Sequence, residues 1–332
     1  MTGWGRSSLG PARLAAEVRA AYAVELVALE PVRAGADAAA RTWSATDSQG
    51  TVWALREASG GSPAGLEAAA ALALPGVPLP RRTASGGLWT EADGLRVSLV
   101  PWVAGRSALE ADPRPAQWAA FGRLLAAVHA APTAALPQSL PRDDHRGDDV
   151  AALVSAADTA VHDAADRIGS DAGDLWVTTR AREGRVLDGV RATGAAGGTG
   201  LVLCHGDPHR GNLVVDEDGE RLWLLDWDDA VLSWPERDLL MVVGGLPGFS
   251  TVSPEQLRWF EEGYGPVRPD PHRLAHHRGV RALEDVSLFA SDALDRALSD
   301  DQRRWALDLV RAHLGPDGIL ALAERSFAEL AA

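Results

Sequence analysis

Residues 201–215 read LVLCHGDPHRGNLVV, in which a group of polar side chains interrupts an apolar run. The polar side chains are those of His205, Asp207, His209 and Asn212. A further apolar run, LWLLD, ends on Asp226, and turn-forming residues separate it from the first. Short apolar runs bounded by turn residues predict strands. Asp207 and Asp226 therefore each follow or end a strand, where a rigid backbone can hold side chains in the fixed positions that a functional site requires.

Three kinds of site could use these residues. His205 and His209 have the i, i+4 spacing of a zinc-binding helix, but Pro208 and the glycines around it break a helix. A serine hydrolase of the G-x-S-x-G type is excluded because the sequence lacks that motif. The pattern Asp-x-x-x-x-Asn followed by an aspartate at the end of the next strand favours phosphoryl transfer.

Phosphoryl transfer needs these residue types. A carboxylate near the line of attack can orient an acceptor hydroxyl and take its proton, and Asp207 is the candidate. Mg²⁺ prefers hard oxygen ligands, which Asn212 and Asp226 supply. If the strand continued past Asp226, Asp228 would share its face and could add a metal or substrate contact.

The composition excludes several other functions. The chain has 332 residues, a formal net charge of −14 and one cysteine, and all 32 of its basic residues are arginine. Without lysine there is no P-loop and no Schiff-base chemistry. The negative charge disfavours nucleic acid as a partner and favours a cationic small molecule. A lone Cys204 and the lack of a long apolar run indicate a soluble cytoplasmic protein without a membrane partner.

The order of elements predicts an α+β fold. Residues 41–57 and about 81–100 are typical of two hairpins, and GLEAAAALAL at 65–74 predicts a helix between them. From about 113 onward the apolar spacing is helical, as in a first segment that Pro132 ends and in two segments at 149–168 and 171–193. Two short strands around the polar loop and further helices complete the chain.

HGDPHRGN and LLDWDDAVLSWPERDL resemble the catalytic-loop and metal-loop signatures of the aminoglycoside phosphotransferase family. This is the antibiotic-kinase branch of the protein-kinase-like fold, and WDDAVLSWPERDLL is similar to spectinomycin phosphotransferases in particular. The resemblance implies a bilobal protein-kinase-like fold: a small antiparallel β-sheet lobe with one helix, then a larger helical lobe. The expected divisions are a nucleotide-binding N-lobe at 1–100, a hinge at 101–105 and a C-lobe at 106–332.

The resemblance also implies roles for individual residues. Asp207 is the expected base, Asn212 and Asp226 the Mg²⁺ ligands, Asp238 a buried carboxylate that braces the catalytic loop, and His205 a structural residue. The VWALR segment is similar to the kinase strand V-A-x-K, with an arginine in place of lysine, and we expect that arginine to bind phosphate oxygens. The expected nucleotide-binding residues are Arg56, its ion-pair partner Glu67, and the hinge residues Val100, Trp102 and Val103 on either side of Pro101.

The acceptor site is expected between the catalytic loop and the C-terminal helices. Five acidic residues could bind ammonium groups there: Asp228, Asp229, Glu236, Glu284 and Asp285. The last two could equally form a solvated helix face. His129 is predicted to pack in the core, whereas Trp227 and Trp234 could pack in the core or stack on a sugar or base.

These features predict a small-molecule kinase that transfers the γ-phosphate of ATP or GTP, with Mg²⁺, to a hydroxyl of an aminoglycoside or aminocyclitol antibiotic. A nucleoside or macrolide antibiotic, choline or an amino alcohol are alternative acceptors. A catalytically silent nucleotide-binding module and a metal-dependent phosphoesterase are more distant alternatives, disfavoured by the complete set of reactive residues and by the nucleotide lobe respectively. No nucleic acid, membrane or obligate protein partner is expected.

Overall fold

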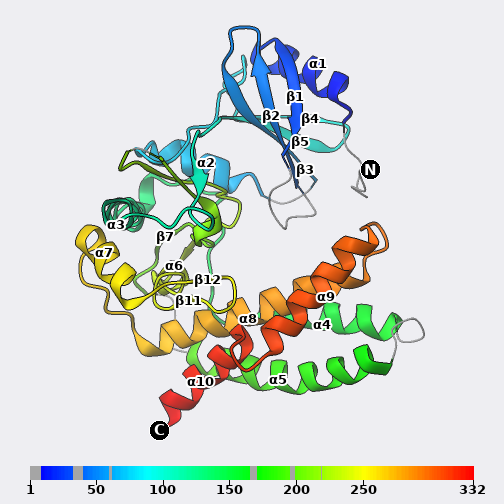
Figure 1. Ribbon diagram of the computed structural model, residues 1–332, viewed down its shortest axis with the longest axis vertical. Helices are drawn as coiled ribbons and strands as arrows, with labels where there is room; N and C mark the ends of the chain where they lie inside the picture. Colours follow the sequence, from blue (N-terminus) through cyan, green and yellow to red (C-terminus); the bar gives the residue numbers. More distant parts are fainter. Residues whose placement is uncertain (1–8, 33–39, 60–61, 165–169, 195–198, 218) are drawn as a thin grey trace.

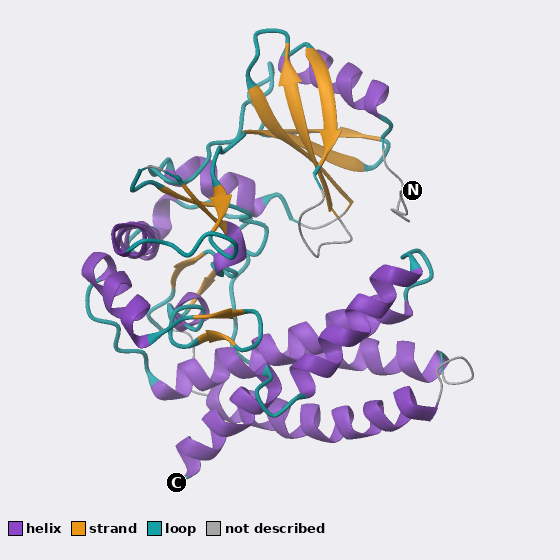
Figure 2. Cartoon of the chain, viewed as in Figure 1, coloured by secondary structure: helices purple, strands orange, loops and turns teal. Residues whose placement is uncertain are grey.

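The computed structural model describes residues 9–32, 40–59, 62–164, 170–194, 199–217 and 219–332. A twisted β-sheet lies at one end of the molecule and a group of long helices at the other, with the catalytic-loop segment between them (Figures 1 and 2). This arrangement confirms the predicted bilobal fold with a small sheet lobe and a larger helical lobe.

The small lobe is a five-stranded antiparallel sheet in the order β1-β2-β3-β5-β4, with helix α1 packed beside it (Figure 1). Its elements are α1 (Pro11–Tyr22), β1 (Leu26–Pro31), β2 (Ala40–Asp47), β3 (Val52–Ser59), β4 (Trp89–Ala92) and β5 (Leu95–Pro101). The β2–β3 turn forms because Asp47 Oδ1 accepts the N–H groups of Gln49 and Thr51, and Gly50 takes a positive φ.

The sheet buries one face against α1. Apolar side chains that alternate along the strands, among them Trp43, Leu55 and Leu99, form one core with Leu14 and Val18 of α1. This alternation is the period-2 pattern of a half-buried strand, and it fixes which side of β3 faces the other lobe.

Helix α2 (Ala64–Leu72) follows the sheet in sequence but packs with the larger lobe. Its buried residues Ala64, Ala68 and Ala69 belong to the same core as Trp118 and Leu213. The first turn of α2 lies directly on the backbone after β9: a Cβ at Gly65 would stand 1.9 Å from the carbonyl oxygen of Trp227. Only glycine allows this approach.

The larger lobe combines short strands with helices. Three strands, β6 (Arg106–Ser107), β8 (Leu213–Val215) and β9 (Leu222–Leu224), form one sheet. β7 (Val202–Cys204) pairs with β10 (Val231–Ser233), and β11 (Gly245–Leu246) pairs with β12 (Ser250–Thr251). The helices are α3 (Pro115–His129), α4 (Asp148–Asp163), α5 (Ser170–Gly194), α6 (Glu236–Leu239), α7 (Pro254–Tyr264), α8 (Pro271–Leu294), α9 (Asp300–Leu314) and α10 (Ile319–Ala331).

Two segments differ from the sequence-based expectation. The hairpin expected from about residue 81 begins only at Trp89, because 81–88 form turns. The strand expected to end on Asp226 stops at Leu224, since Asp226 takes a positive φ of 60° that a strand does not allow. Among the helices of the described residues, none has the length and apolar character needed to cross a membrane.

Candidate active site

The catalytic loop lies between β7 and β8, and a buried carboxylate holds its backbone. Asp238, fully buried on α6, accepts the N–H of His205 through Oδ2 and the N–H of Gly206 through Oδ1, both at 2.8 Å. His205 donates from Nε2 to the carbonyl of Leu225 at 2.8 Å and so connects the loop to the segment that carries Asp226. Asp238 and His205 thus occupy the supporting positions that the sequence resemblance implied.

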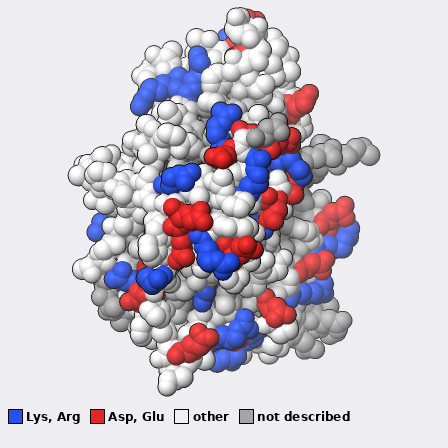
Figure 3. Space-filling model, turned by 60° about the vertical axis from the view of Figure 1, so that its left-hand side comes forward, with Lys and Arg blue, Asp and Glu red and all other residues white. Residues whose placement is uncertain are grey.

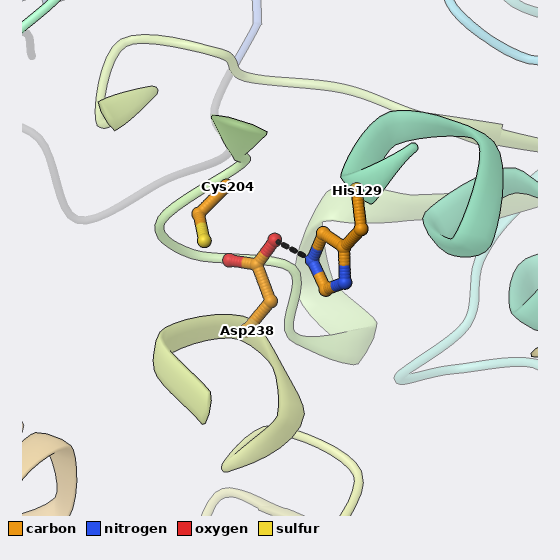
Figure 4. A group of neighbouring side chains, drawn as sticks. All are labelled: His129, Cys204 and Asp238. Atoms are coloured by element: carbon orange, nitrogen blue, oxygen red, sulfur yellow. Dashed lines mark hydrogen bonds and ion pairs between the residues drawn. The ribbon is translucent and has the colours of Figure 1, made fainter. Parts of the chain in front are cut away.

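A third contact to Asp238 comes from α3. His129 Nε2 lies 3.1 Å from Asp238 Oδ2 (Figure 4). The other ring nitrogen, Nδ1, lies 2.8 Å from the hydroxyl of Tyr264. Cys204 completes a trio of possible metal ligands, but its Sγ contacts the carbonyl of Trp234 at 3.3 Å. Burial raises the pKa of the Cys204 thiol, which disfavours the thiolate that metals bind. The His129–Asp238 pair is therefore a hydrogen-bonded support, and the His129 side chain, 7 % exposed, packs in the interior as the sequence predicted.

Asp207 is largely buried, with 17 % of its side chain exposed. Its Oδ1 accepts a hydrogen bond from Arg281 Nη1 at 2.7 Å, and its Oδ2 lies 3.4 Å from Nδ2 of Asn212 and 3.4 Å from Nε2 of His209. Burial acts to raise the pKa of Asp207, but the combined effect of the Arg281 charge, the two histidines His209 and His205 and the Arg281 hydrogen bond outweighs it, and the pKa is lowered. The carboxylate is therefore ionised and able to accept a proton.

Asn212 and Asp226 offer oxygen atoms suited to Mg²⁺. Asn212 donates from Nδ2 to the carbonyl of Asp207 at 2.9 Å, which leaves its Oδ1 free of this contact. The Leu225 N–H donates to the carbonyl of Asn212 at 2.8 Å, so the two segments are tied together just before Asp226. The positive φ of Asp226 turns its side chain out of the strand direction, and 41 % of that side chain is exposed. A carboxylate and an amide oxygen are a hard donor set that fits the ion.

Arg56 on β3 reaches across to the same segment. Its Nη1 lies 2.7 Å from Asp226 Oδ1 and its Nη2 lies 2.8 Å from Asp228 Oδ2. Burial raises the pKa of Asp228, and the charge of Arg56 opposes this effect. Asp228 and Asp226 are therefore brought together by their shared contact with Arg56. They do not lie on one face of a strand, as expected if the strand continued, because β9 ends at Leu224.

The expected ion pair between Arg56 and Glu67 is not formed and is replaced by other contacts. Glu67 accepts a hydrogen bond from the hydroxyl of Ser139, a residue of the larger lobe. The physical reason is the position of α2, whose first turn rests on Trp227, so Glu67 is directed to the larger lobe and away from the sheet.

The register between β3 and β5 determines which backbone groups of the hinge point toward β3. The N–H of Trp102 donates to the carbonyl of Val52 at 3.1 Å, and the register pairs Val100 with Ala54. Because hydrogen-bonded pairs alternate along an antiparallel ladder, the peptide groups of Val100 and Trp102 both point toward β3. The backbone groups of these two residues are therefore directed at β3, and their contact with a base stays a prediction. Pro101, which the register pairs with Trp53, alternates with these two residues, so its carbonyl points away from β3.

Three of the five predicted acceptor-site carboxylates are accessible: Asp228, which pairs with Arg56, and also Asp229 and Glu284. Asp229 is exposed and makes no hydrogen bond or ion pair with the described residues, and Glu284 is one-third exposed, with Arg237 Nη2 at 3.7 Å from its Oε1. Burial by surrounding groups and the nearby charge of Asp207 raise the pKa of Asp229. Burial likewise raises the pKa of Glu284, although Arg237 and Arg281 oppose it.

The other two carboxylates of this group are internal. Glu236 is only 4 % exposed, and its Oε1 accepts the N–H of Asp270 at the start of α8. Asp285 is 7 % exposed and pairs with Arg281, whose Nε lies 2.9 Å from its Oδ1. Glu236 and Asp285 are therefore structural contacts, which corrects the prediction that they meet the acceptor.

Arg281 and Arg237 are the residues that sequence reasoning missed. Arg281 pairs with Asp207, and Arg237 lies near Glu284 and Asp143; burial of such cations is tolerated only when they are paired. The sequence signal for Arg281 is a basic residue within the apolar stripe of α8 with an aspartate four residues later. Its partner Asp207 could not be found in this way because it is 74 residues distant.

A second trio of possible metal ligands lies under β10. Nε2 of His145, Nε2 of His277 and Oδ2 of Asp143 surround the hydroxyl of Ser233 at 3.3, 3.5 and 3.0 Å. The serine hydroxyl satisfies all three groups. Trp234, which is 1 % exposed, stacks on His145, and Trp227 is also buried, so both tryptophans pack in the core and do not stack on a nucleotide.

Charged side chains of both signs lie close together over the middle of the molecule on the face shown in Figure 3.

Three features define the class of kinase-like phosphotransferases. They are a bilobal fold, a catalytic loop with a buried ionised aspartate, and an adjoining asparagine–aspartate pair. A family model described as the phosphotransferase enzyme family matches residues 29–277, and the chain belongs to this family. The resemblance to the aminoglycoside phosphotransferases is thereby confirmed, and the protein is an enzyme of the phosphotransferase class.

Solved structures with the same fold have low sequence identity to the chain. A spectinomycin phosphotransferase in complex with ADP and spectinomycin is 19% identical with a TM-score of 0.78, covering 96% of this chain and 99% of that one. An amicoumacin kinase in complex with AMP-PNP, Ca²⁺ and its antibiotic is 15% identical with a TM-score of 0.60, covering 97% of each chain. A macrolide 2′-phosphotransferase from Brachybacterium faecium is 20% identical with a TM-score of 0.51, covering 89% and 95%. No curated protein matches the chain in sequence.

Proposed function

We propose that the chain is a kinase that transfers the γ-phosphate of ATP or GTP, in the presence of Mg²⁺, to a hydroxyl of a small cationic antibiotic of the spectinomycin-like aminocyclitol type. The observation that carries this proposal is the ionised Asp207, held at the end of a braced loop beside the accessible carboxylates Asp229 and Glu284. The structural likeness to a spectinomycin phosphotransferase supports the choice of acceptor.

In this reaction Asp207 accepts a hydrogen bond from the acceptor hydroxyl and takes its proton as the oxygen attacks the γ-phosphorus. The new O–P bond forms as the bond to the bridging β,γ-oxygen breaks, and the nucleoside diphosphate leaves. Mg²⁺ held by Asn212 and Asp226 would neutralise charge on the β- and γ-phosphates. Arg56, which lies against Asp226, is placed to bind phosphate oxygens with its planar guanidinium.

The nucleotide base is proposed to bind at the hinge through the carbonyl of Pro101 and the N–H of Val103. The Pro101 carbonyl faces away from β3 and offers an acceptor, and the N–H of Val103, just beyond the strand, would offer a donor. The acceptor's ammonium groups are proposed to meet Asp229 and Glu284. Asp229 forms no close ion pair among the described residues, although the charges of Arg237 and Arg281 act on it, so a cation of the acceptor would supply a direct partner and lower further the pKa that burial raises.

A panel of acceptors tests the proposal. The protein is incubated with MgATP or MgGTP and with spectinomycin, aminoglycosides, a macrolide, a nucleoside antibiotic, choline or ethanolamine, and mass spectrometry detects a phosphate adduct. An adduct on spectinomycin or an aminoglycoside is expected. An adduct only on another antibiotic, or only on choline or ethanolamine, would replace the proposed acceptor and leave the kinase chemistry intact. Nucleotide binding without any adduct would support a silent nucleotide-binding module.

The substitution Asp207→Asn tests the role of the base. It keeps the size of the side chain and removes the proton acceptor, so kcat should fall by about 10²- to 10⁴-fold. Asp216→Asn, in the β8–β9 turn, is the matched control because the Asp216 carboxylate accepts the N–H of Gly219 and contacts Arg221 within that turn. If Asp207→Asn kept kcat within about tenfold, or roughly 1.4 kcal/mol of barrier, the assignment of the base would be wrong.

A further inference from the structure

Arg281 lies near the middle of α8 with its side chain directed at the catalytic loop. It stands between the buried residues Val280, Ala282 and Leu283, and its side chain is 19 % exposed. A guanidinium cannot lose its charge in this environment, so its burial has to be balanced by partners of opposite charge. The structure supplies two carboxylates for this purpose.

The two carboxylates hold the guanidinium from different directions. Arg281 Nη1 donates to Asp207 Oδ1 at 2.7 Å, and Arg281 Nε lies 2.9 Å from Asp285 Oδ1, one helical turn further along α8. On the side of α9, Asp285 faces His313, whose Nε2 lies 3.8 Å from its Oδ2. The chain of charges Asp207–Arg281–Asp285 therefore connects the catalytic loop to the helices of the larger lobe.

The second oxygen of Asp207 is held by the loop itself. Oδ2 lies 3.4 Å from Asn212 Nδ2 and 3.4 Å from His209 Nε2. His209 can donate from Nε2, because its Nδ1 accepts the N–H of Gly211 at 2.9 Å. Arg281 makes the shortest of these contacts and is the one that comes from outside the loop, so it determines the orientation of the carboxylate plane relative to α8.

We propose that Arg281 is a positioning residue for phosphoryl transfer: fixed by Asp285, it orients the carboxylate of Asp207 toward the acceptor hydroxyl. The inference depends on the proposed role of Asp207 as the base. Orientation matters because a misplacement of about 1 Å in a reacting group can cost about 10²-fold in rate. An arginine suits this role since its rigid fork can contact two carboxylates at once, whereas the single ammonium group of a lysine has no such geometry.

The experiment compares Arg281→Ala and Arg281→Lys with Arg278→Gln. Arg278 is the matched control, one turn earlier on α8, where it contacts the carbonyl of Val243 and the hydroxyl of Ser326 and does not contact Asp207. Two rates are measured with MgATP: phosphate transfer to spectinomycin, and the slower hydrolysis by water without an added acceptor. Circular dichroism and thermal unfolding establish that each variant is folded.

Arg281→Ala should lower kcat by about 10- to 100-fold and leave KM for ATP unchanged, because Arg281 pairs with Asp207 and Asp285 and not with the residues proposed to bind the nucleotide. Methylguanidinium added to this variant should restore part of the rate by occupying the vacated space, and Arg281→Lys should retain an intermediate rate. Arg278→Gln should keep kcat within about twofold of the parent.

Three results would overturn the inference. They are a kcat for Arg281→Ala within about threefold of the parent, a change confined to KM for ATP, or a loss in a folded protein that neither methylguanidinium nor lysine reverses. Asp207→Asn separates this failure from failure of the proposed function. If Asp207→Asn is inactive and Arg281→Ala is not, only the positioning role is wrong; if Asp207→Asn is active, the base assignment itself is wrong.

Discussion

Two buried carboxylates in the larger lobe have opposite surroundings. Asp238, under the catalytic loop, is fully buried and accepts contacts from the N–H groups of His205 and Gly206 and from His129. Glu183, in the middle of α5, is 1 % exposed, and neither of its oxygens has a hydrogen-bond partner among the described residues. Burial, with a smaller effect of Asp158, raises the pKa of Glu183 to about 7.

The comparison shows that a buried carboxylate can support the site, as Asp238 does, or only lower the stability of the fold, as Glu183 does. A buried charge is tolerated where donors replace the water it has lost, and at Asp238 those donors are the backbone of the catalytic loop itself. At Glu183 the charge is not compensated, so the folded protein retains the proton to a higher pH than the unfolded chain. The following predictions remove one carboxylate or the other, and then a buried imidazole that lies near both regions.

Asp238→Ala is expected to have the largest effect. It leaves two backbone N–H groups and His129 without an acceptor in the interior, which should cost about 3 to 5 kcal/mol of unfolding free energy, and kcat should fall because the catalytic loop loses its support. Urea unfolding measures the first effect and the phosphate-transfer assay the second. A loss below about 1 kcal/mol would mean that other groups hold the loop.

Glu183→Gln should stabilise the protein at alkaline pH. Because the pKa of Glu183 is higher in the folded state than in the unfolded state, the parent loses stability as the pH rises from about 4.5 to about 7. The neutral, isosteric glutamine removes that loss, so the variant should gain roughly 2 to 3 kcal/mol more at pH 8 than at pH 5. Urea unfolding at both pH values measures the gain.

The control for this experiment is Glu329→Gln on the exposed side of α10. Its stability should differ little from that of the parent at either pH, because an exposed carboxylate keeps its hydration when the chain folds. Equal gains at pH 5 and pH 8 for Glu183→Gln would contradict the view that an uncompensated charge is the cause.

His276→Asn should flatten the acid side of the stability profile, with the smallest of the three effects. Burial lowers the pKa of His276 to about 4, and its Nδ1 donates to the carbonyl of Val190 at 3.0 Å, a bond that the asparagine amide can imitate. Since the folded pKa is depressed, stability is present above pH 6.5 and is lost as the pH falls from there toward 4.

Between pH 7 and pH 5 the variant should lose about 2 kcal/mol less than the parent, measured by urea unfolding. The exposed His162→Asn is the control, and its profile should follow that of the parent. An unchanged profile for His276→Asn would assign the acid sensitivity to the neighbouring His145 and His277, whose pKa values burial also lowers.

The sequence alone predicted the parts of the site that are local in the chain. Asp207 and Asn212 lie in one loop and Asp226 follows the next strand, so a motif of a few dozen residues places them together. The hairpins and most helices were predicted from apolar periodicity, and the bilobal fold from the family resemblance. Their ends were less certain: β9 stops before Asp226 because that residue has a positive φ, which no periodicity shows.

Contacts between distant segments could not be predicted in this way. The partners of Arg56 are Asp226 and Asp228, 170 and 172 positions away, and Arg281 meets Asp207 through the docking of α8. The hinge contacts depended on a strand register, because one position of slip would exchange the peptide groups that face β3 with those that face away. Glutamate and aspartate are usually exposed, so the sequence gives no sign that Glu236 and Asp285 are buried. Only the tertiary packing shows it.

The close approach of Gly65 to Trp227 determines which parts of the molecule can move as units. Helix α2 is packed into the core of the larger lobe, together with Trp118 and Leu213. A motion that closed the small lobe over a bound nucleotide would therefore carry the sheet and α1, while α2 remained stationary. Glu67 would then stay with its stationary neighbours, whereas Arg56 would travel with β3. The contact of Arg56 with Asp226 thus spans the joint between the mobile and fixed bodies, and its length would report how far the enzyme has closed.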